Sequence, residues 1–183
     1  MLHLASAVQT TTLTGVAQGQ AALPKLKAAA LQGHGAVVLD FADFELMTAS
    51  AFREAILPLA VLLNNEGRTC VMVNANEVIR EEAEIAAERS GMPLLFAKTH
   101  GSTLVDTKVV GALDEKLAIT LDVVLKQGEA DAKSVSEQSG ESTVTTVWNN
   151  RLVALQKMGL LRERKVGKTK FYSPVVEGMS RGS

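Results

Sequence analysis

Polar and basic side chains are concentrated in the last third of this 183-residue chain. Between Arg162 and Lys170, five of the nine residues are Lys or Arg, and a segment rich in Thr and Asn precedes them. Cations neutralise the phosphates of a nucleic-acid backbone, whereas Asn and Thr hydrogen-bond to base edges in the major groove. The sequence therefore predicts contact with duplex DNA, and the alternative interpretation is a solvated charged hairpin. The predicted contact residues are Thr145, Thr146, Asn149, Asn150, Arg151, Val153, Lys157, Arg162, Arg164, Lys165, Lys168 and Lys170.

An amphipathic helix is expected to present the Thr and Asn side chains. Apolar residues recur there at steps of three or four, which is the spacing of a buried helical stripe. Ser142 or Thr143 is expected to cap the first turn with a side-chain oxygen, and Gly159 to end the helix. The predicted stripe consists of Val144, Trp148, Leu152, Leu155 and Met158.

A hairpin is expected to follow this helix and to carry the cations. Leu160–Arg164 is predicted as a strand, Lys165–Lys168 as a turn and Thr169–Ser173 as the return strand. A short helix is expected upstream at Asp131–Gln138, followed by a Gly-containing turn at Ser139–Ser142. Two helices joined by such a turn are typical of a helix-turn-helix.

The same segment resembles the recognition helix and wing of bacterial winged-helix transcription regulators. The resemblance covers about the last third of the chain, and it implies an α+β winged-helix domain that binds double-stranded DNA. Such modules commonly bind as dimers on two half-sites, so a homodimer is expected. The matching residues are Asn150-Arg151-Leu152, Leu155, Gly159-Leu160-Leu161, Arg162 and Arg164.

Strand and helix patterns alternate in the first half of the chain. Ala36–Phe41 and Arg68–Val73 are short apolar runs typical of strands buried on both faces, and Leu94–Ala97 is expected to be a last short strand. Helical patterns lie between them, including one that begins near Thr48 and one at Glu77–Ser90. This alternation predicts an α/β domain with a mostly parallel sheet.

The segment Val37–Leu63 resembles the STAS-like domains, which are relatives of the anti-sigma factor antagonists. The matching features are the apolar strand ending in Asp40, the Asp43-Phe44 turn and the Ser50-x-Phe52-x-Glu54 opening of the next helix. The resemblance covers roughly residues 1–97. It implies a sensory or partner-binding domain.

A regulatory phosphorylation site is the second implication of that resemblance. The antagonists open this helix with Asp-Ser-Ser-Gly, and the phosphorylated serine corresponds to Ser50, whereas Thr48 stands in place of the acidic residue. A phosphate at a helix N-terminus would meet free N–H groups and the positive end of the helix dipole. The alternatives are that Ser50 only begins the helix and that Glu54 is either a site residue or an ion partner of Arg53.

Composition narrows the function classes. Residues 1–130 carry 10 Lys/Arg against 15 Asp/Glu, and residues 131–183 carry 9 against 5, so only the C-terminal part has a net positive charge. The single cysteine, Cys70, cannot form an internal disulfide and so predicts a reducing cytoplasm. The sequence has no apolar run long enough to predict a membrane span. His3, His34 and His100 lack metal-ligand spacing, and no nucleophile motif or phosphate loop is present. We therefore expect no enzymatic activity, no cofactor and no metal.

The sequence thus predicts a STAS-like domain at 1–97, a linker at 98–111, a winged-helix domain at 112–177 and a flexible tail at 178–183. The predicted function is a cytoplasmic bacterial transcription regulator that binds duplex DNA as a homodimer. A protein partner or kinase would act on its STAS-like domain. The alternative is a partner-switching interaction module, with phosphorylation at Ser50, that does not bind DNA. A third, more distant reading is a hydrolase or transferase that uses Ser50 and Glu54.

Overall fold

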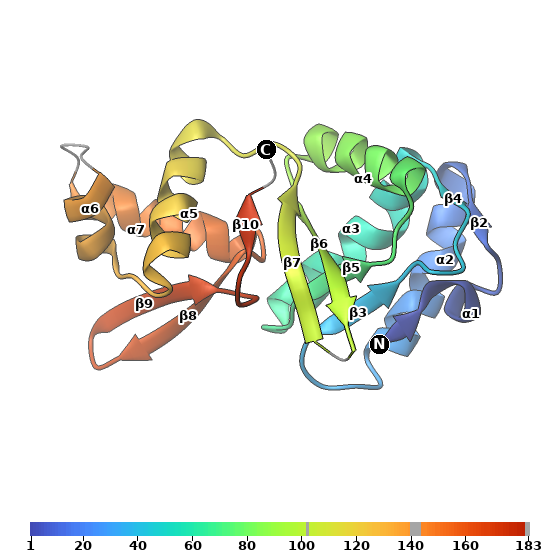
Figure 1. The fold of residues 1–183 in the computed structure, drawn as a ribbon, viewed down its shortest axis with the longest axis horizontal. Coiled ribbons are helices and arrows are strands. Elements are labelled where there is room, and N and C mark those ends of the chain that lie inside the picture. The colour runs from blue at the N-terminus through green and yellow to red at the C-terminus, as the bar shows by residue number, and fades with distance from the viewer. Residues whose placement is uncertain (102, 140–143, 182–183) are drawn as a thin grey trace. The chain divides into compact units, whose positions relative to one another are not determined.

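The structure, a computed structural model, describes residues 1–101, 103–139 and 144–181 (Figure 1). Contacts divide the chain into two compact units, Met1–Ala112 and Leu113–Arg181. The described ranges contain seven α-helices, and none of these is long and apolar enough to cross a membrane.

Five strands of the first unit lie in one sheet, in the order β1-β3-β5-β6-β7 (Figure 1). Neighbouring strands are parallel from β1 to β6, whereas β7 is antiparallel to β6. The predicted mixed α/β fold with a mostly parallel sheet is therefore confirmed. A small second sheet pairs β2 (Thr12–Leu13) with β4 (Leu46–Met47). The bounds in the main sheet are β1 Leu2–His3, β3 Val37–Asp40, β5 Cys70–Val73, β6 Leu94–His100 and β7 Thr103–Val110.

A row of apolar side chains joins the sheet of the first unit to its helices. Leu39 pairs with Met72 and Met72 with Phe96 across β3, β5 and β6, and all three side chains are buried. Residues two apart on a strand share a face, so Leu94 lies on the same face as Phe96. These residues form one core cluster with helical side chains. The helices are α1 Leu4–Val8, α2 Gly15–Ala30, α3 Ala49–Asn65 and α4 Glu77–Ser90.

Helices α2 and α3 approach each other closely at Gly19. A Cβ atom added to this glycine would lie 2.9 Å from the carbonyl oxygen of Ala51 and 2.9 Å from Cβ of Glu54. Real Cβ atoms essentially never come that close to other heavy atoms, so only glycine allows this separation of the two helices. The contact fixes the start of α3, where the candidate regulatory residues lie.

The second unit consists of three helices and a hairpin. Its helices are α5 (Glu115–Gln127), α6 (Ala132–Ser139) and α7 (Thr145–Lys157). Strands β8 (Leu161–Val166) and β9 (Thr169–Pro174) pair antiparallel, and a two-residue turn joins Val166 to Thr169. Gly159 ends α7 with a φ of 77°, as the sequence predicts. The fully buried hydrophobic side chains are Leu121, Val124, Val135, Trp148, Leu152, Leu155, Leu160 and Tyr172.

The predicted linker at 98–111 is wrong. Strand β6 continues to His100, and β7 occupies most of the remaining segment. The polar residues that suggested a linker alternate with Thr107 and Val109, both of which are buried, as in a half-exposed strand. The first unit therefore extends to Ala112, beyond the predicted boundary at residue 97.

The start of the chain and the start of α7 also differ from simple sequence patterns or lie beyond them. The N-terminal strand is limited to β1, because Leu4 and Val8 are buried four residues apart on helix α1. Val144 is 70% exposed and is the cap residue of α7 rather than part of its buried stripe. The predicted caps Ser142 and Thr143 lie outside the described residues.

The predicted tail is ordered in its first half. Met179 is buried, and the guanidinium of Arg181 donates two hydrogen bonds of 2.6 Å to the carboxylate of Asp122. Ser180 and Arg181 form the short strand β10. The last two residues, 182 and 183, lie outside the described part of the chain.

Candidate functional site

Helix α7 has a buried face and a polar face. Trp148, Leu152 and Leu155 are fully buried. The predicted contact residues at positions 146, 150, 153 and 157 recur at steps of three or four, so they form a stripe on the opposite side of the helix. The side chains of Thr145, Thr146, Asn150 and Lys157 are exposed, and those of Asn149, Arg151 and Val153 are half-buried.

Arg151 lies between the two faces of α7. Its guanidinium carbon sits 4.3 Å from the ring centroid of Trp148, which is a cation–π contact. This contact holds the guanidinium against the helix, while the side chain stays half-exposed. Trp148 itself is core, because no part of its surface is exposed.

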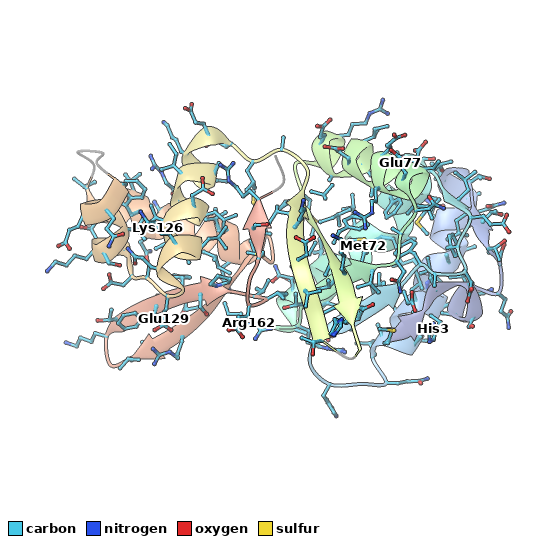
Figure 2. The ribbon with its side chains drawn as sticks, viewed as in Figure 1. His3, Met72, Glu77, Lys126, Glu129 and Arg162 are labelled. Atoms are coloured by element: carbon cyan, nitrogen blue, oxygen red, sulfur yellow. The ribbon has the colours of Figure 1, made fainter. Side chains whose placement is uncertain are left out.

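The hairpin exposes every residue from Arg162, which is labelled in Figure 2, to Lys170. Residues of this segment pair across β8 and β9 in an unbroken register, and Gly167 adopts a φ of 59° in the turn. The exposed set holds five cations and one carboxylate, that of Glu163. An isolated pair of hydrogen bonds, between Ala130 and Tyr172, joins β9 to the segment before α6.

Arg164 and Lys170 each have an acidic partner. Arg164 donates hydrogen bonds of 3.1 and 2.7 Å to Glu129 and lies 5.4 Å from the ring centroid of Phe171. The Arg164 hydrogen bond lowers the pKa of Glu129, and the same bond raises the pKa of Arg164. Glu129 is labelled beside the hairpin in Figure 2.

The second pair lies within the hairpin. The Lys170 ammonium donates to Glu163 at 2.8 Å, and the Tyr172 hydroxyl donates to the same carboxylate at 3.2 Å. The Lys170 hydrogen bond is the main cause that lowers the pKa of Glu163. Desolvation, followed by the charge of Glu163, raises the pKa of Tyr172 to about 12.

These pairs divide the cations into two groups, which sequence spacing does not reveal. Arg164 and Lys170 are largely neutralised by neighbours that the sequence places 35 and 7 residues away. Lys165 lies near the end of β8 and Lys168 in the turn itself, and neither forms a salt bridge with any described residue. The turn lysines are therefore the cations best placed to meet an external anion.

The N-terminus of α3 holds the other predicted site residues. The Thr48 hydroxyl caps the helix by accepting from the Ala51 N–H at 3.4 Å, and it also accepts from the Gly15 N–H at 3.0 Å. Its oxygen lies 3.1 Å from the hydroxyl oxygen of Ser50, which is half-buried. Thr48 and Ser50 therefore do come together, as a cap and its neighbour.

A carboxylate from α4 already occupies this helix end. Glu82 accepts a hydrogen bond of 2.5 Å from the Ala49 N–H, so it contributes a negative charge at the positive end of α3. Glu82 is half-buried, whereas its neighbour Glu81 on the same helix is exposed. A carboxylate 33 residues distant from its partner leaves no local signal that could have revealed the contact.

Glu54 behaves as an ion partner. Its carboxylate accepts from Gln20 at 3.1 Å and from Arg53 at 3.0 Å. These two hydrogen bonds, that of Gln20 first, lower the pKa of Glu54. No hydrogen bond joins it to Ser50 in the described part of the chain, so the two residues do not form a nucleophile and base.

A polar cluster that sequence reasoning missed lies at the carboxyl ends of the parallel strands. The buried carboxylate of Asp40 accepts from the Asn74 side chain at 2.8 Å and from the Ala42 N–H at 3.0 Å. The Nδ1 atom of His3 lies 3.1 Å from its second oxygen. Asp40 is thus satisfied by its own neighbours, one of which is His3.

The remaining candidates for chemistry are inert by their surroundings. Burial raises the pKa of Cys70 to about 12, which keeps its sulfur in the poorly nucleophilic thiol form. Across the described ranges, no group of three or more His, Cys, Asp or Glu side chains is arranged to hold a metal ion.

No protein-family model, curated protein or solved structure matches this chain.

Proposed function

We propose that the protein is a transcription regulator that binds duplex DNA through its second unit, used as a winged helix. Helix α7 would enter the major groove and the β8–β9 hairpin would lie along the sugar-phosphate backbone or in a neighbouring minor groove. The observation that supports this proposal most directly is the exposed run Arg162–Lys170, which follows a helix with a polar outer face.

The contacts divide into two kinds under this proposal. Asn150 and Thr146 on the outer stripe of α7 would read base edges, because Asn pairs with adenine through two hydrogen bonds and Thr contacts a thymine methyl group. Lys165 and Lys168 would contact phosphates, which contribute affinity without sequence preference. The cation of Arg164, shared with Glu129, would contribute less.

The first unit would be the STAS-like sensory or partner-binding part of this cytoplasmic bacterial regulator, which we propose acts as a homodimer. Two copies on adjacent half-sites would combine two weak modules into one tight complex. A regulatory protein or kinase acting at Ser50 is part of the same proposal. A phosphate there would compete with Glu82 for the N–H groups of α3.

Fluorescence anisotropy with a labelled 30-base-pair duplex tests the proposal on the full-length chain. The variant K165E/K168E should lose most of its affinity. The control K27E/R89E changes the net charge equally and lies in the first unit, so it should bind almost as the native protein does. Selection from a random DNA pool would then reveal the preferred site.

The rival function is a partner-switching module that does not touch DNA. It predicts no binding to any duplex and the same result for K165E/K168E and K27E/R89E. Loss of DNA binding in the first variant alone excludes this rival.

A further inference from the structure

A small cavity lies beside the irregular part of the β6–β7 hairpin, in the first unit. The strand register shifts between Phe96 and Lys98, and Asp106 adopts a φ of 52°, in the left-handed region. A β-bulge of this kind re-aims the side chains next to it. The result is an open cavity of about 160 Å³ lined by Arg80 of α4 and by Phe96, Ala97, Lys98, Asp106, Lys108 and Val110.

The charges around the cavity do not balance. Three cations, Arg80, Lys98 and Lys108, face one carboxylate, that of Asp106. Lys98 and Asp106 form a salt bridge of 2.7 Å. The Lys98 hydrogen bond is the main cause that lowers the pKa of Asp106, and Lys108 and Arg80 act in the same direction. Within this lining, the charges of Arg80 and Lys108 therefore remain without a salt bridge to any described residue, while four glutamates of α4 line the adjoining hollow.

Arg80 is held in place before any ligand arrives. Its Nε atom donates to the Ala75 carbonyl at 3.1 Å, and its guanidinium lies 5.8 Å from the ring centroid of Phe96. Its two terminal nitrogens make no hydrogen bond within the described part of the chain. A fixed guanidinium with free terminal donors suits an oxyanion that accepts two hydrogen bonds.

We propose that this cavity binds the phosphate group of a small phosphorylated metabolite. The net double positive charge matches a phosphomonoester dianion, and the buried Phe96 ring gives the cavity an apolar floor. A volume of about 160 Å³ leaves room for a phosphate group.

The rest of the ligand would extend along α4. A second hollow of about 480 Å³ shares Arg80, Lys108 and Val110 with the cavity, and its lining also includes four glutamates of α4. Glutamates accept hydrogen bonds from hydroxyl groups and repel a second phosphate. The adjoining space therefore favours a hydroxyl-rich body such as a sugar, and the ligand class is a sugar phosphate. The glutamates are Glu77, Glu81, Glu84 and Glu88.

Thermal unfolding and NMR titration of the full-length chain test this site without any DNA. Inorganic phosphate and glucose 6-phosphate are compared with sodium chloride at the same ionic strength. Both anions should raise the Tm, the sugar phosphate at lower concentration, and the R80Q/K108Q variant should lose at least tenfold in affinity. The charge-matched control K27Q/R89Q should respond as the native protein does.

The amide shifts of the native protein keep the test decisive even if R80Q/K108Q does not fold. The changes caused by phosphate should concentrate on residues 96–98 and 106–110. Equal effects of chloride and phosphate, an unchanged response of R80Q/K108Q, or shifts spread over all surface lysines would overturn the proposal. A loss of DNA affinity in R80Q/K108Q without any response to phosphate would also overturn it, because the cations would then belong to a nucleic-acid surface. Failure of the DNA-binding proposal alone would leave these results unchanged.

Discussion

The two turn lysines of the hairpin permit a quantitative test of DNA binding. In K165Q/K168Q, two exposed positive charges disappear and no salt bridge with any described residue is broken. We expect the free energy of unfolding to change by less than about 0.5 kcal/mol, as for other exposed positions. Any large change in DNA affinity can then be assigned to the lost charges.

The size of the expected loss in DNA affinity follows from counterion release. Each phosphate contact contributes about 0.9 to the slope of log affinity against log salt concentration, so losing two contacts should flatten the slope by about 1.8. At about 0.15 M salt this corresponds to a roughly 30-fold weaker complex, or about 2 kcal/mol. The difference should widen to about 200-fold at about 0.05 M salt, because the two lines diverge as salt is diluted.

Glu129→Gln should act in the opposite direction. This substitution removes the carboxylate that binds Arg164 with two hydrogen bonds and so returns one cation to the surface. We expect the salt slope to become steeper by up to about 0.9 and the affinity for a random duplex to rise. Anisotropy titrations of the native protein and both variants at four salt concentrations measure all of these quantities.

A native salt slope in K165Q/K168Q would contradict the proposed contacts between these two lysines and DNA phosphates. A parallel loss for the control K27Q/R89Q would also contradict them, because the effect would then come from net charge alone and not from the hairpin. An unchanged salt slope in Glu129→Gln would show that the hydrogen bonds to Glu129 do not keep Arg164 from contacting DNA.

Three further predictions concern the fold around the candidate sites. Glu82→Ala should lower the free energy of unfolding by about 1–2 kcal/mol, because the Ala49 N–H loses a charged acceptor, whereas Glu81→Ala should change it by less than about 0.5 kcal/mol in urea unfolding. Gly19→Ala should cost about 1–3 kcal/mol through the close approach of two helices, and a calorimetric Tm measures it. The pKa of Glu163 is lowered in the fold, so the stability that its carboxylate contributes is complete above the usual pKa of 4.5. This stability is lost as the pH falls through the lower folded pKa. In Glu163→Gln, the Tm should therefore decrease less on acidification.

The parallel part of the sheet could be predicted because its signal is local. Val37–Asp40 and Cys70–Val73 are short apolar runs, and burial on both faces produces that pattern without any reference to distant partners. Strand β7 could not be predicted from such a run, because only alternate residues such as Thr107 and Val109 are buried. A half-exposed strand with polar residues between buried ones has almost the composition of a linker.

The sequence predicts where the candidate site residues lie, but it does not predict which of their charges are paired. Periodicity located the polar stripe of α7, since the burial of Trp148 and Leu152 determines which residues face outward. The partners of the charged residues come from other elements, as with Arg164 and Glu129 or with Ala49 and Glu82. A count of charges along the hairpin therefore overstates the charge available for phosphate, whereas the contacts reduce the unpaired cations of the turn to Lys165 and Lys168.

The difference between the position of a residue and the charges around it also applies to Ser50 as a candidate regulatory site. The helix dipole and free N–H groups favour an anion at the start of α3, but the Glu82 carboxylate already uses the Ala49 N–H. A phosphate on Ser50 would add its charge beside that carboxylate, so its effect on the fold should depend on whether Glu82 can move away. We expect Ser50→Asp to destabilise the native protein by about 1 kcal/mol and to be nearly neutral in Glu82→Gln, because like charges repel at short range. A double-mutant cycle in urea measures this coupling, and equal effects of Ser50→Asp in both backgrounds would show that the two carboxylates do not meet.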